Sequence, residues 1–159
     1  MITFSKGNKY FSYRAAAVFM HNNRVLLNYI GESKNWFLPG GRVEMTEPSK
    51  ESVVREIKEE LEVDATIGRL LWVNENLYQK ENIQIHELGL YFLASFTDDH
   101  PLYQRTEPFI GPEILPDGAT TTFHWHPVDQ LKEITMYPNY LVEGLANLPK
   151  STEYIISRR

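Results

Sequence analysis

The distribution of apolar residues along the chain predicts two pairs of β-strands. Apolar runs at residues 10–20 and 24–30 are separated by a His-Asn-Asn sequence that favours a tight turn, so they are predicted to form a β-hairpin. Residues 65–77 and 83–96 are two further long apolar runs with polar residues between them, and an antiparallel pair is again expected. The last run is apolar on both faces from residue 88 onward. A strand of that kind belongs in a sheet that is covered on both sides.

A helix is predicted for residues 48–61, which contain no glycine and are rich in Glu, Lys and Ser. Its apolar residues recur with the 3.6-residue period of an amphipathic helix and are expected to face a core: Val53, Val54, Ile57 and Leu61. Thr46 is a candidate N-cap, and Pro48 is expected in the first turn, where a missing N–H does no harm. The Pro-Gly-Gly sequence upstream allows a sharp entry to the helix and a close approach of backbone to a ligand.

The two ends of the chain carry weaker signals. Residues 1–9 are compatible with a short edge strand or a hairpin arm, and residues 154–156 with a final edge strand. Residues 129–131 are expected to start a short helix. A second amphipathic helix is predicted for residues 138–148, with three leucines facing inward: Leu141, Leu145 and Leu148. No repeat, low-complexity tract or second domain is visible, so residues 1–159 are predicted to form a single domain.

A long segment at residues 97–121 is rich in Pro, Gly and acidic residues and is predicted to be a loop. Loops of this length in compact domains are commonly functional or disordered. Its charged residues are the groups that it can bring to a site, chiefly Arg105, Glu107 and Glu113.

Two histidines lie in the strand predicted after this loop. His124 and His126 flank Trp125, so both imidazoles are expected on the side of the strand opposite the indole. Histidines at this spacing can bind a metal ion. Because no further acidic residues lie close in sequence, a position on a surface face is the preferred interpretation.

Three carboxylates share one flank of the predicted helix. Glu56 lies three and four residues before Glu59 and Glu60, spacings that place side chains on the same side of a helix. Like charges at these spacings are destabilising, so a positive charge is expected nearby. Mg²⁺ is a suitable complement, because it takes carboxylate oxygens and keeps waters and substrate phosphates as its other ligands. A glutamate-rich helix flank by itself is more often solvated surface. The interpretation therefore depends on the wider pattern.

Composition limits the functions that need to be considered. The chain has 159 residues, 42% of them hydrophobic and 13% aromatic, which is typical of a globular domain with a substantial core. A net charge of −5 argues against a general binder of nucleic-acid backbones. The absence of cysteine excludes disulfides, thiolate catalysis and cysteine-based zinc sites. No apolar run is long enough for a membrane span, and a cytoplasmic protein is expected.

The wider pattern around the carboxylates runs from Gly41 to Val63. Five residues separate Gly41 from Glu47, seven separate Glu47 from Arg55, and the sequence Arg-Glu-Ile-Lys-Glu-Glu follows. This spacing resembles the Nudix box, G-x5-E-x7-R-E-U-x-E-E-x-G-U, in which U is aliphatic. The chain matches every specified position except the second glycine, where Glu62 stands. A glutamate there costs about 1 kcal/mol if the left-handed geometry common at helix ends is retained.

The resemblance implies a fold and an activity. The expected architecture is α+β, a Nudix-type α/β/α sandwich with a mixed, mostly antiparallel sheet, in which the box forms a loop-helix-loop. Members of this family typically hydrolyse the diphosphate linkage of a nucleoside diphosphate joined to another moiety, with Mg²⁺ or Mn²⁺ as cofactor. The implied substrate is thus a small nucleotide-type molecule, with no nucleic acid or membrane as partner, and a homodimer is left open.

The resemblance also assigns roles to residues of the box. It implies that Glu56, Glu59 and Glu60 hold the metal ion, that Glu47 supports the site or adds an outer ligand, and that Arg55 orients or balances a carboxylate. The general base is expected among the box glutamates, Glu59 and Glu56, or else on the later loop at Glu113 or Glu107. The expected substrate-binding positions are Gly40 and Gly41, which shape the turn, Glu44, and Trp36, which is either a packed hydrophobe or a platform on which a base stacks.

Several readings remain open on sequence grounds. The substrate class is undetermined among nucleoside triphosphates, nucleotide sugars and dinucleoside polyphosphates. A non-catalytic nucleotide-binding or sensing module of the same fold is one alternative, although it predicts a damaged carboxylate set and the set here is intact. Isoprenoid diphosphate isomerisation on the same fold resembles this chain less, because those enzymes need a cysteine that is absent. An interaction protein that uses the helix surface without a metal is a third reading.

Overall fold

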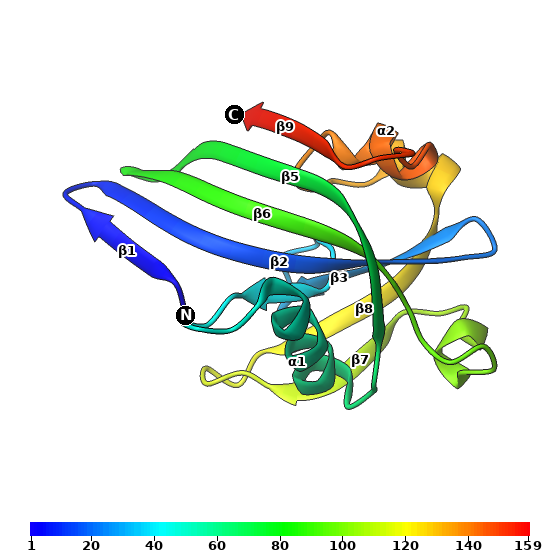
Figure 1. Cartoon of the computed structure of the whole chain (residues 1–159). Helices are drawn as coiled ribbons and strands as arrows, with labels where there is room; N and C mark the ends of the chain where they lie inside the picture. Colours follow the sequence, from blue (N-terminus) through cyan, green and yellow to red (C-terminus); the bar gives the residue numbers. More distant parts are fainter.

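The computed structural model describes residues 1–159 and shows one large mixed sheet with few helices (Figure 1). The path of neighbouring strands through the sheet is β7-β8-β3-β2-β6-β5-β9, and β1 and β4 also pair with β2. The strands are β1 (Thr3–Lys6), β2 (Lys9–His21), β3 (Arg24–Ile30), β4 (Gly40–Arg42), β5 (Thr66–Lys80), β6 (Ile83–Ser95), β7 (Phe109–Ile114), β8 (Thr120–Pro127) and β9 (Glu153–Arg158). The helices are α1 (Ser49–Leu61), α2 (Leu141–Ala146) and the 3₁₀ turns η1 (Pro101–Gln104) and η2 (Val128–Glu133).

Strand β2 organises the sheet because it pairs with four other strands. One of its edges runs parallel to β6 over almost its whole length. The other edge pairs antiparallel with β1, then with β4, and finally with β3. The predicted hairpin is confirmed: Asn22 and Asn23 both have positive φ, 50° and 60°, as a tight turn between β2 and β3 requires. The antiparallel pair β5–β6 and the final edge strand, β9, are also found.

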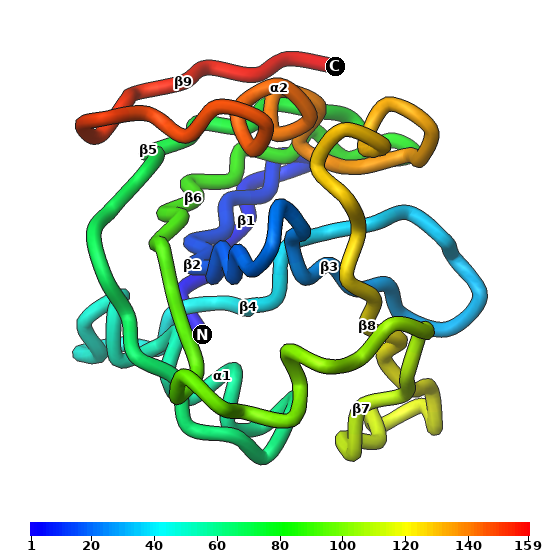
Figure 2. Tube along the Cα trace, turned by 90° about the vertical axis from the view of Figure 1, so that its right-hand side faces the viewer, coloured from blue at the N-terminus to red at the C-terminus, as the bar shows by residue number.

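The sheet is covered on both faces, as the apolar run after residue 88 predicted. Alternate residues of β2 enter different cores, with Ala15, Ala17 and Phe19 facing α1 and Ala16 and Val18 facing η2 and α2. Figure 2 shows α1 and α2 on opposite sides of the sheet. The α/β/α architecture expected from the resemblance is thus present, and the box lies on α1 and the loop before it. No helix in the protein combines the length and the apolar composition that crossing a membrane requires.

The helix of the box differs from its prediction in two details. Val53, Ile57 and Leu61 are buried as expected, but Val54 is 38% exposed because it lies one residue past the stripe that faces the sheet. The predicted cap at Thr46 is wrong. The residue before the helix is Pro48, no side chain caps the first turn, and Thr46 lies in the loop with a φ of 67°.

The end of α1 retains the geometry that a glycine normally serves. Glu62 has φ 57° and ψ 27°, in the left-handed region, and its N–H donates to the carbonyl oxygen of Lys58 at 2.9 Å. The departure from the box pattern therefore leaves the turn intact. The cost is local strain of about 1 kcal/mol rather than a changed path of the chain.

The predicted loop at residues 97–121 is wrong in part, because it contains η1, strand β7 and the first residues of β8. Strand β7 lies at the edge of the sheet and pairs with β8 through an irregular register. Edge strands tolerate Pro112, which cannot donate to a ladder, so the proline content concealed the strand. The predicted helix at residues 138–148 is also shorter, since α2 comprises only Leu141–Ala146.

The histidine pair of β8 is only partly on a surface face, because His126 is buried and His124 is half-buried. His124 and His126 do point to the same side, with ring centroids 4.6 Å apart. However, His126 is buried, and Trp36 packs against its ring at 4.4 Å. Burial lowers the pKa of His126 to about 4, so this imidazole is neutral at pH 7. The sequence could not reveal this cover, because the tryptophan comes from a distant loop.

Candidate active site

Two glycines let the backbone of β4 lie close to β2 and to the box helix. Gly40 and Gly41 pair with Ala16 and Ala15 of β2. A Cβ atom on Gly40 would overlap the backbone of Ala15, whereas a Cβ atom on Gly41 would overlap the carboxylate of Glu56. The first glycine is therefore required by the sheet. The second makes room for a functional side chain.

This difference yields a prediction for Gly41→Ala. Gly41 has no positive φ, so the substitution costs little in backbone energy but displaces the Glu56 carboxylate. We expect turnover to fall about tenfold while the melting temperature changes by only a few degrees. Steady-state kinetics and thermal unfolding measure the two effects. Gly40→Ala is the contrasting variant, which should mainly lower stability. Equal loss of stability in both variants would contradict this assignment.

The guanidinium of Arg55 holds three carboxylates of the box together. Its Nε and Nη2 atoms donate to the two carboxylate oxygens of Glu47 at 2.8 and 3.1 Å. Its Nη1 atom donates to Glu56 at 3.0 Å and to Glu59 at 3.2 Å. The hydrogen bonds from Arg55 lower the pKa of Glu47, so Glu47 is ionised at neutral pH. Arg55 thus supplies the positive charge that the clustered glutamates require.

The fourth carboxylate of the box, on Glu60, lies in a different environment. Glu60 is buried, and its Oε2 atom has no hydrogen-bond partner. Burial raises its pKa to about 8, an effect that the backbone N–H of Gly40 and the charge of Arg14 oppose. The nearby charges of Glu56 and Glu113 raise it further. Burial also raises the pKa of Glu56, although Arg55 offsets part of this. The site therefore contains one buried acid that lacks a cationic partner in contact with it.

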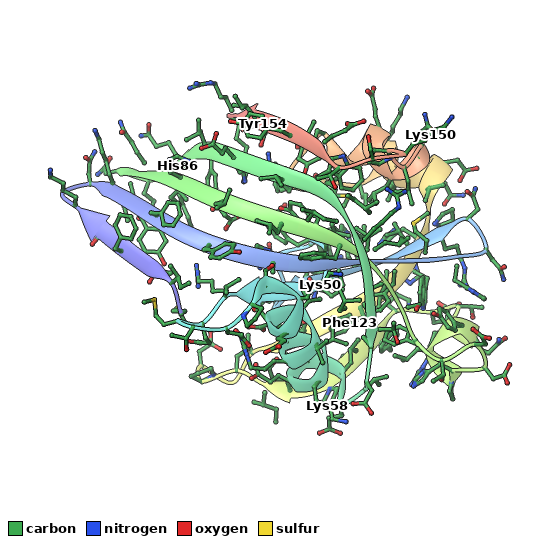
Figure 3. The ribbon with its side chains drawn as sticks, in the orientation of Figure 1. Lys50, Lys58, His86, Phe123, Lys150 and Tyr154 are labelled. Carbon is green, nitrogen blue, oxygen red and sulfur yellow. The ribbon has the colours of Figure 1, made fainter.

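The carboxylates open onto two cavities on either side of the box. Glu60 lines a cavity of about 430 Å³ together with Gly40, Gly41 and three cations, Arg14, Arg42 and Lys80. Glu47 and Glu59 line a second, outer cavity of about 480 Å³, into which Arg55 and Lys58 also project. Figure 3 shows Lys58 on the outer side of α1. A phosphate-bearing ligand in the first cavity would face these three cations and two carboxylates, those of Glu60 and Glu87.

The residues of the box meet the chemical requirements of a divalent cation. The buried oxygen of Glu60 lacks a partner, and carboxylate oxygens are the ligands that Mg²⁺ and Mn²⁺ prefer. No group of three acidic or imidazole side chains is arranged as a finished metal cage. Arg55 contacts Glu47, Glu56 and Glu59, whereas Glu60 has no contact with this guanidinium.

The structure brings one of the two predicted loop glutamates to the box. Glu113 lies on β7 near enough to raise the pKa of Glu60. Glu107 lies instead beside His124; burial lowers the pKa of His124, and the charge of Glu107 opposes this shift. The backbone N–H of Glu44 donates to Glu47 at 3.0 Å, which fixes the loop before α1.

Trp36 is not among the residues that line the cavity at Glu60. It packs against Tyr29 and His126, with ring centroids at 4.7 and 4.4 Å, and its backbone pairs with Met136. The aromatic residue that lines the cavity is Phe37, which is 37% exposed. Phe37 therefore lies where Trp36 was considered as a stacking platform for a base.

Further residues of the cavity were missed from the sequence, Arg42 among them. Arg14 donates to the carbonyl oxygen of Leu38 at 2.8 Å and lines the cavity with Asn28 and Lys80. A signal for Arg14 was present, since it is the one charged residue in the middle of an otherwise aromatic and apolar strand. No comparable signal marks Asn28 or Lys80, because they come from β3 and the end of β5.

Comparison with known proteins agrees with this geometry. The model of the NUDIX domain matches residues 12–144. The chain belongs to the NUDIX family. Among curated relatives, "Putative nudix hydrolase 1" of Caenorhabditis elegans is 30% identical over 130 residues, which cover 76% of this chain and 30% of that protein. The m7GpppN-mRNA hydrolase of Saccharomyces cerevisiae is 29% identical over 96 residues, which cover 60% of this chain and 10% of that protein.

This NUDIX chain thus spans 30% of the length of the Caenorhabditis elegans relative and 10% of the length of the yeast relative. Among solved structures, the MutT protein from Bacillus halodurans has the same fold. It aligns with a TM-score of 0.61 at 16% identity, covering 90% of this chain and 86% of that chain. The mixed sheet and its few helices are therefore a NUDIX fold.

Proposed function

We propose that this NUDIX domain is a hydrolase that depends on a divalent metal ion and cleaves a diphosphate linkage in a nucleoside diphosphate derivative. The observation that carries the proposal is the position of Glu60. Its buried, unpartnered carboxylate forms one wall of a cavity whose other walls carry three cations and one further carboxylate: Arg14, Arg42, Lys80 and Glu87. Cations and a metal-binding carboxylate around one space are what a diphosphate requires, because its own charge repels nucleophiles.

Each group around this cavity has a part in binding. Arg14, Arg42 and Lys80 would bind phosphate oxygens, and Arg14 is already oriented by its hydrogen bond to Leu38. Phe37 would stack on the base or another planar part of the substrate. Gly40 and Gly41 would let the phosphates approach the backbone closely, because neither residue presents a side chain.

Hydrolysis needs an attacking water and a group that accepts its proton. Glu56, Glu59 and Glu60 would hold Mg²⁺ or Mn²⁺, with Glu47 as an outer ligand. The ion, when bound, neutralises phosphate oxygens and makes water more acidic. The proton would pass to a box carboxylate, and we favour Glu56 because its carboxylate lies directly against Gly41. Glu113 is the alternative base, since it lies near Glu60. Arg55 keeps Glu47, Glu56 and Glu59 oriented.

The substrate class is best tested with a panel. Nucleoside triphosphates, nucleotide sugars and dinucleoside polyphosphates all contain the linkage. Capped mRNA joins the panel because the yeast relative is named an m7GpppN-mRNA hydrolase. Product release would be measured with Mg²⁺, with Mn²⁺ and with a chelator. We expect cleavage of one class that needs the metal ion and stops with chelator.

Two results would contradict the proposal. Cleavage that persists in chelator would exclude the metal-dependent mechanism. Nucleotide binding without turnover of any substrate in either metal would favour the second candidate, a non-catalytic nucleotide-binding or sensing module. The intact set of carboxylates around Arg55 argues against that candidate.

A further inference from the structure

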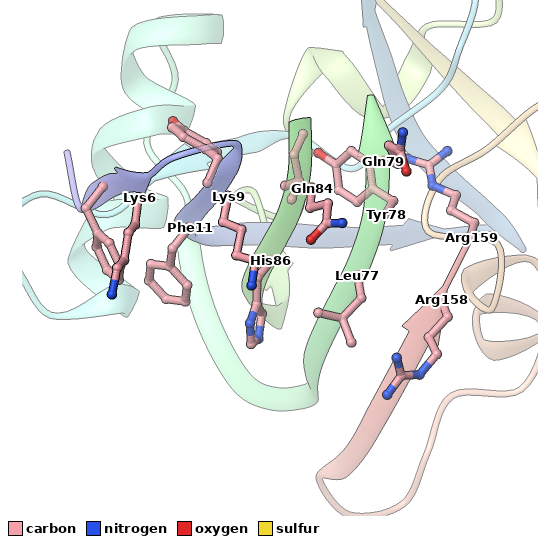
Figure 4. A pocket seen from close by; sticks show the side chains of 13 residues that line it. Lys6, Lys9, Phe11, Leu77, Tyr78, Gln79, Gln84, His86, Arg158 and Arg159 are labelled. Atoms are coloured by element: carbon pink, nitrogen blue, oxygen red, sulfur yellow. The ribbon is translucent and has the colours of Figure 1, made fainter. Parts of the chain in front are cut away.

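A third hollow lies away from the box, at the end of the sheet where β1 meets β2 (Figure 4). Its volume is about 660 Å³, larger than that of the cavity at Glu60. It is lined by residues of β1, β2, β5, β6 and β9 and by the final Arg159. None of the residues that line the cavity at Glu60 belongs to it. We call this hollow the sheet-end groove.

The register of the strands shows that an aromatic row crosses this groove. Phe4 pairs with Phe11, Phe11 with His86, His86 with Leu77, and Leu77 with Arg158. Residues paired across neighbouring strands share a face of the sheet, so these five side chains lie side by side. The rings of Phe4 and Phe11 stack with centroids 4.9 Å apart, and His86 meets Phe11 edge-on at 5.7 Å.

A polar row runs beside the aromatic one. Lys6 pairs with Lys9, Lys9 with Gln84, and Gln84 with Gln79. All four side chains are exposed and line the groove. Lysines therefore flank the aromatic rings at the hairpin end, and Arg158 flanks them at the opposite edge.

No helix covers this part of the sheet. Figure 1 shows the ends of β1, β2, β5, β6 and β9 extending past α1, and Figure 3 places His86 and Tyr154 there, away from Lys50 on the helix. Phe4 is 64% exposed as a result. An aromatic ring left in water at the floor of a groove indicates a surface that a ligand can use.

The charge of the groove is opposite to that of the whole chain. The protein carries a formal net charge of −5, but the groove is lined by Lys6, Lys9, Arg158 and Arg159 and by no acidic residue. One carboxylate, Glu75, contacts a residue of the groove: it is hydrogen-bonded to His86, and it also accepts a hydrogen bond from the Tyr154 hydroxyl. The groove is thus a local cationic region on an acidic protein, which favours an anionic ligand.

We propose that the sheet-end groove binds single-stranded nucleic acid. Bases would stack on Phe4, Phe11 and His86, since every base has a face that an aromatic ring accepts. Phosphates would contact Lys6 and Lys9 at one side and Arg158 at the other. Four strand spacings, about 19 Å, separate Lys6 from Arg158, and three, about 14 Å, separate Lys9 from Arg158. A single phosphate group cannot contact both sides of the groove, whereas a chain of nucleotides can.

This proposal replaces the expectation from net charge that nucleic acid is not a partner. Net charge averages over the whole surface, and binding depends on the charges that face the ligand. The inference does not require the hydrolase activity, because the two sites share no lining residue.

The test is the binding of a fluorescein-labelled oligouridylate of about 12 nucleotides, measured by fluorescence anisotropy in chelator so that metal-dependent cleavage cannot occur. A deoxythymidylate of the same length distinguishes RNA from DNA.

We expect binding that weakens steeply between about 50 and 200 mM salt. Lys6→Glu/Lys9→Glu should weaken it at least about tenfold and reduce the salt slope by about 1.4, which corresponds to two phosphate contacts on a single strand. Phe4→Ala should weaken it about tenfold without changing the slope.

A double variant with the same charge change serves as the control. Lys132 and Lys150 are exposed and lie on the side of η2 and α2, and Lys150 is far from His86 in Figure 3. Lys132→Glu/Lys150→Glu should bind like the unmodified protein. If both double variants weakened oligonucleotide binding equally, the effect would come from the net charge of the protein rather than from the groove, which would overturn the proposal. Absence of binding at low salt, or binding that Phe4→Ala and Lys6→Glu/Lys9→Glu leave intact, would overturn it as well. Hydrolysis of a small nucleotide substrate should be the same in all of these variants, which separates this test from that of the proposed function.

Discussion

Glu60→Gln is expected to lower kcat/KM about 100- to 1,000-fold while the protein remains folded. Glu60 is the buried carboxylate at the wall of the cationic cavity, and its Oε2 atom has no partner within the protein. Glutamine keeps the size of the side chain but cannot supply a charged oxygen to a metal ion. Steady-state kinetics with Mg²⁺ and with Mn²⁺ would measure the loss.

The same substitution should make the metal-free protein more stable at alkaline pH. Burial raises the pKa of Glu60 from 4.5 to about 8. Between these pH values the folded protein holds a proton that the unfolded chain has released, so stability falls as pH rises through this range. Glu60→Gln removes that decline, and we expect a gain on the order of 1–3 kcal/mol at pH 8 in chelator. Urea unfolding at pH 5 and at pH 8 would measure the difference.

Glu133→Gln is the matched control for Glu60→Gln. Glu133 lies on η2, is exposed, and lines neither of the two cavities at the box. Its replacement should leave both kcat/KM and the pH dependence of stability nearly unchanged. A Glu60→Gln variant that retained near-normal turnover would show that this carboxylate does not take part in the reaction.

Arg55→Ala is expected to have the second largest effect, because it leaves three carboxylates without their shared cation. Glu47, Glu56 and Glu59 all accept hydrogen bonds from this guanidinium. We expect kcat/KM to fall about 100-fold as these side chains separate. Stability should fall by about 1–2 kcal/mol, a modest loss because part of the cluster is exposed to solvent. Added Mg²⁺ should recover much of that stability, since it neutralises the same carboxylates.

Two variants define the controls for Arg55→Ala. Arg55→Lys retains the charge but cannot donate to three carboxylates from a planar fork, so it should recover stability more than activity. Arg69→Ala removes an exposed arginine of β5 and should change neither property. Melting temperatures with and without Mg²⁺, together with kinetics, would separate the outcomes. Full activity in Arg55→Lys would show that only the charge at this position matters.

The box and the grouping of its carboxylates could be predicted because they depend on short-range spacing. Glu56, Glu59 and Glu60 lie within one and a half turns of a single helix, so their common flank follows from the geometry of that helix. Gly41 and Glu47 lie just upstream, and the chain between them is too short to lead elsewhere. The hairpin around Asn22 and the buried stripe at Val53, Ile57 and Leu61 are local in the same sense.

The tertiary structure alone decided how these groups differ from one another. Glu59 and Glu60 are neighbours in sequence, yet Arg55 neutralises one and the protein interior encloses the other beside Gly40. The same applies to the aromatic residues, since Trp36 packs against His126 of β8 while Phe37 faces the cavity. These distinctions depend on which distant strands pack against each residue, and such contacts cannot be read from a single sequence.

The sequence by itself therefore determined the family, the class of fold and the carboxylate set of this protein, because each depends on residues within a few turns of one another. The tertiary structure decided which cations face the buried acid and which part of the sheet is left open. Arg14, Arg42 and Lys80 come from three different strands and line the same cavity as Glu60. The sheet-end groove is assembled from five strands whose register only the folded chain defines. Both features arise from pairing between distant segments, and hydrophobic periodicity does not show which segments pair.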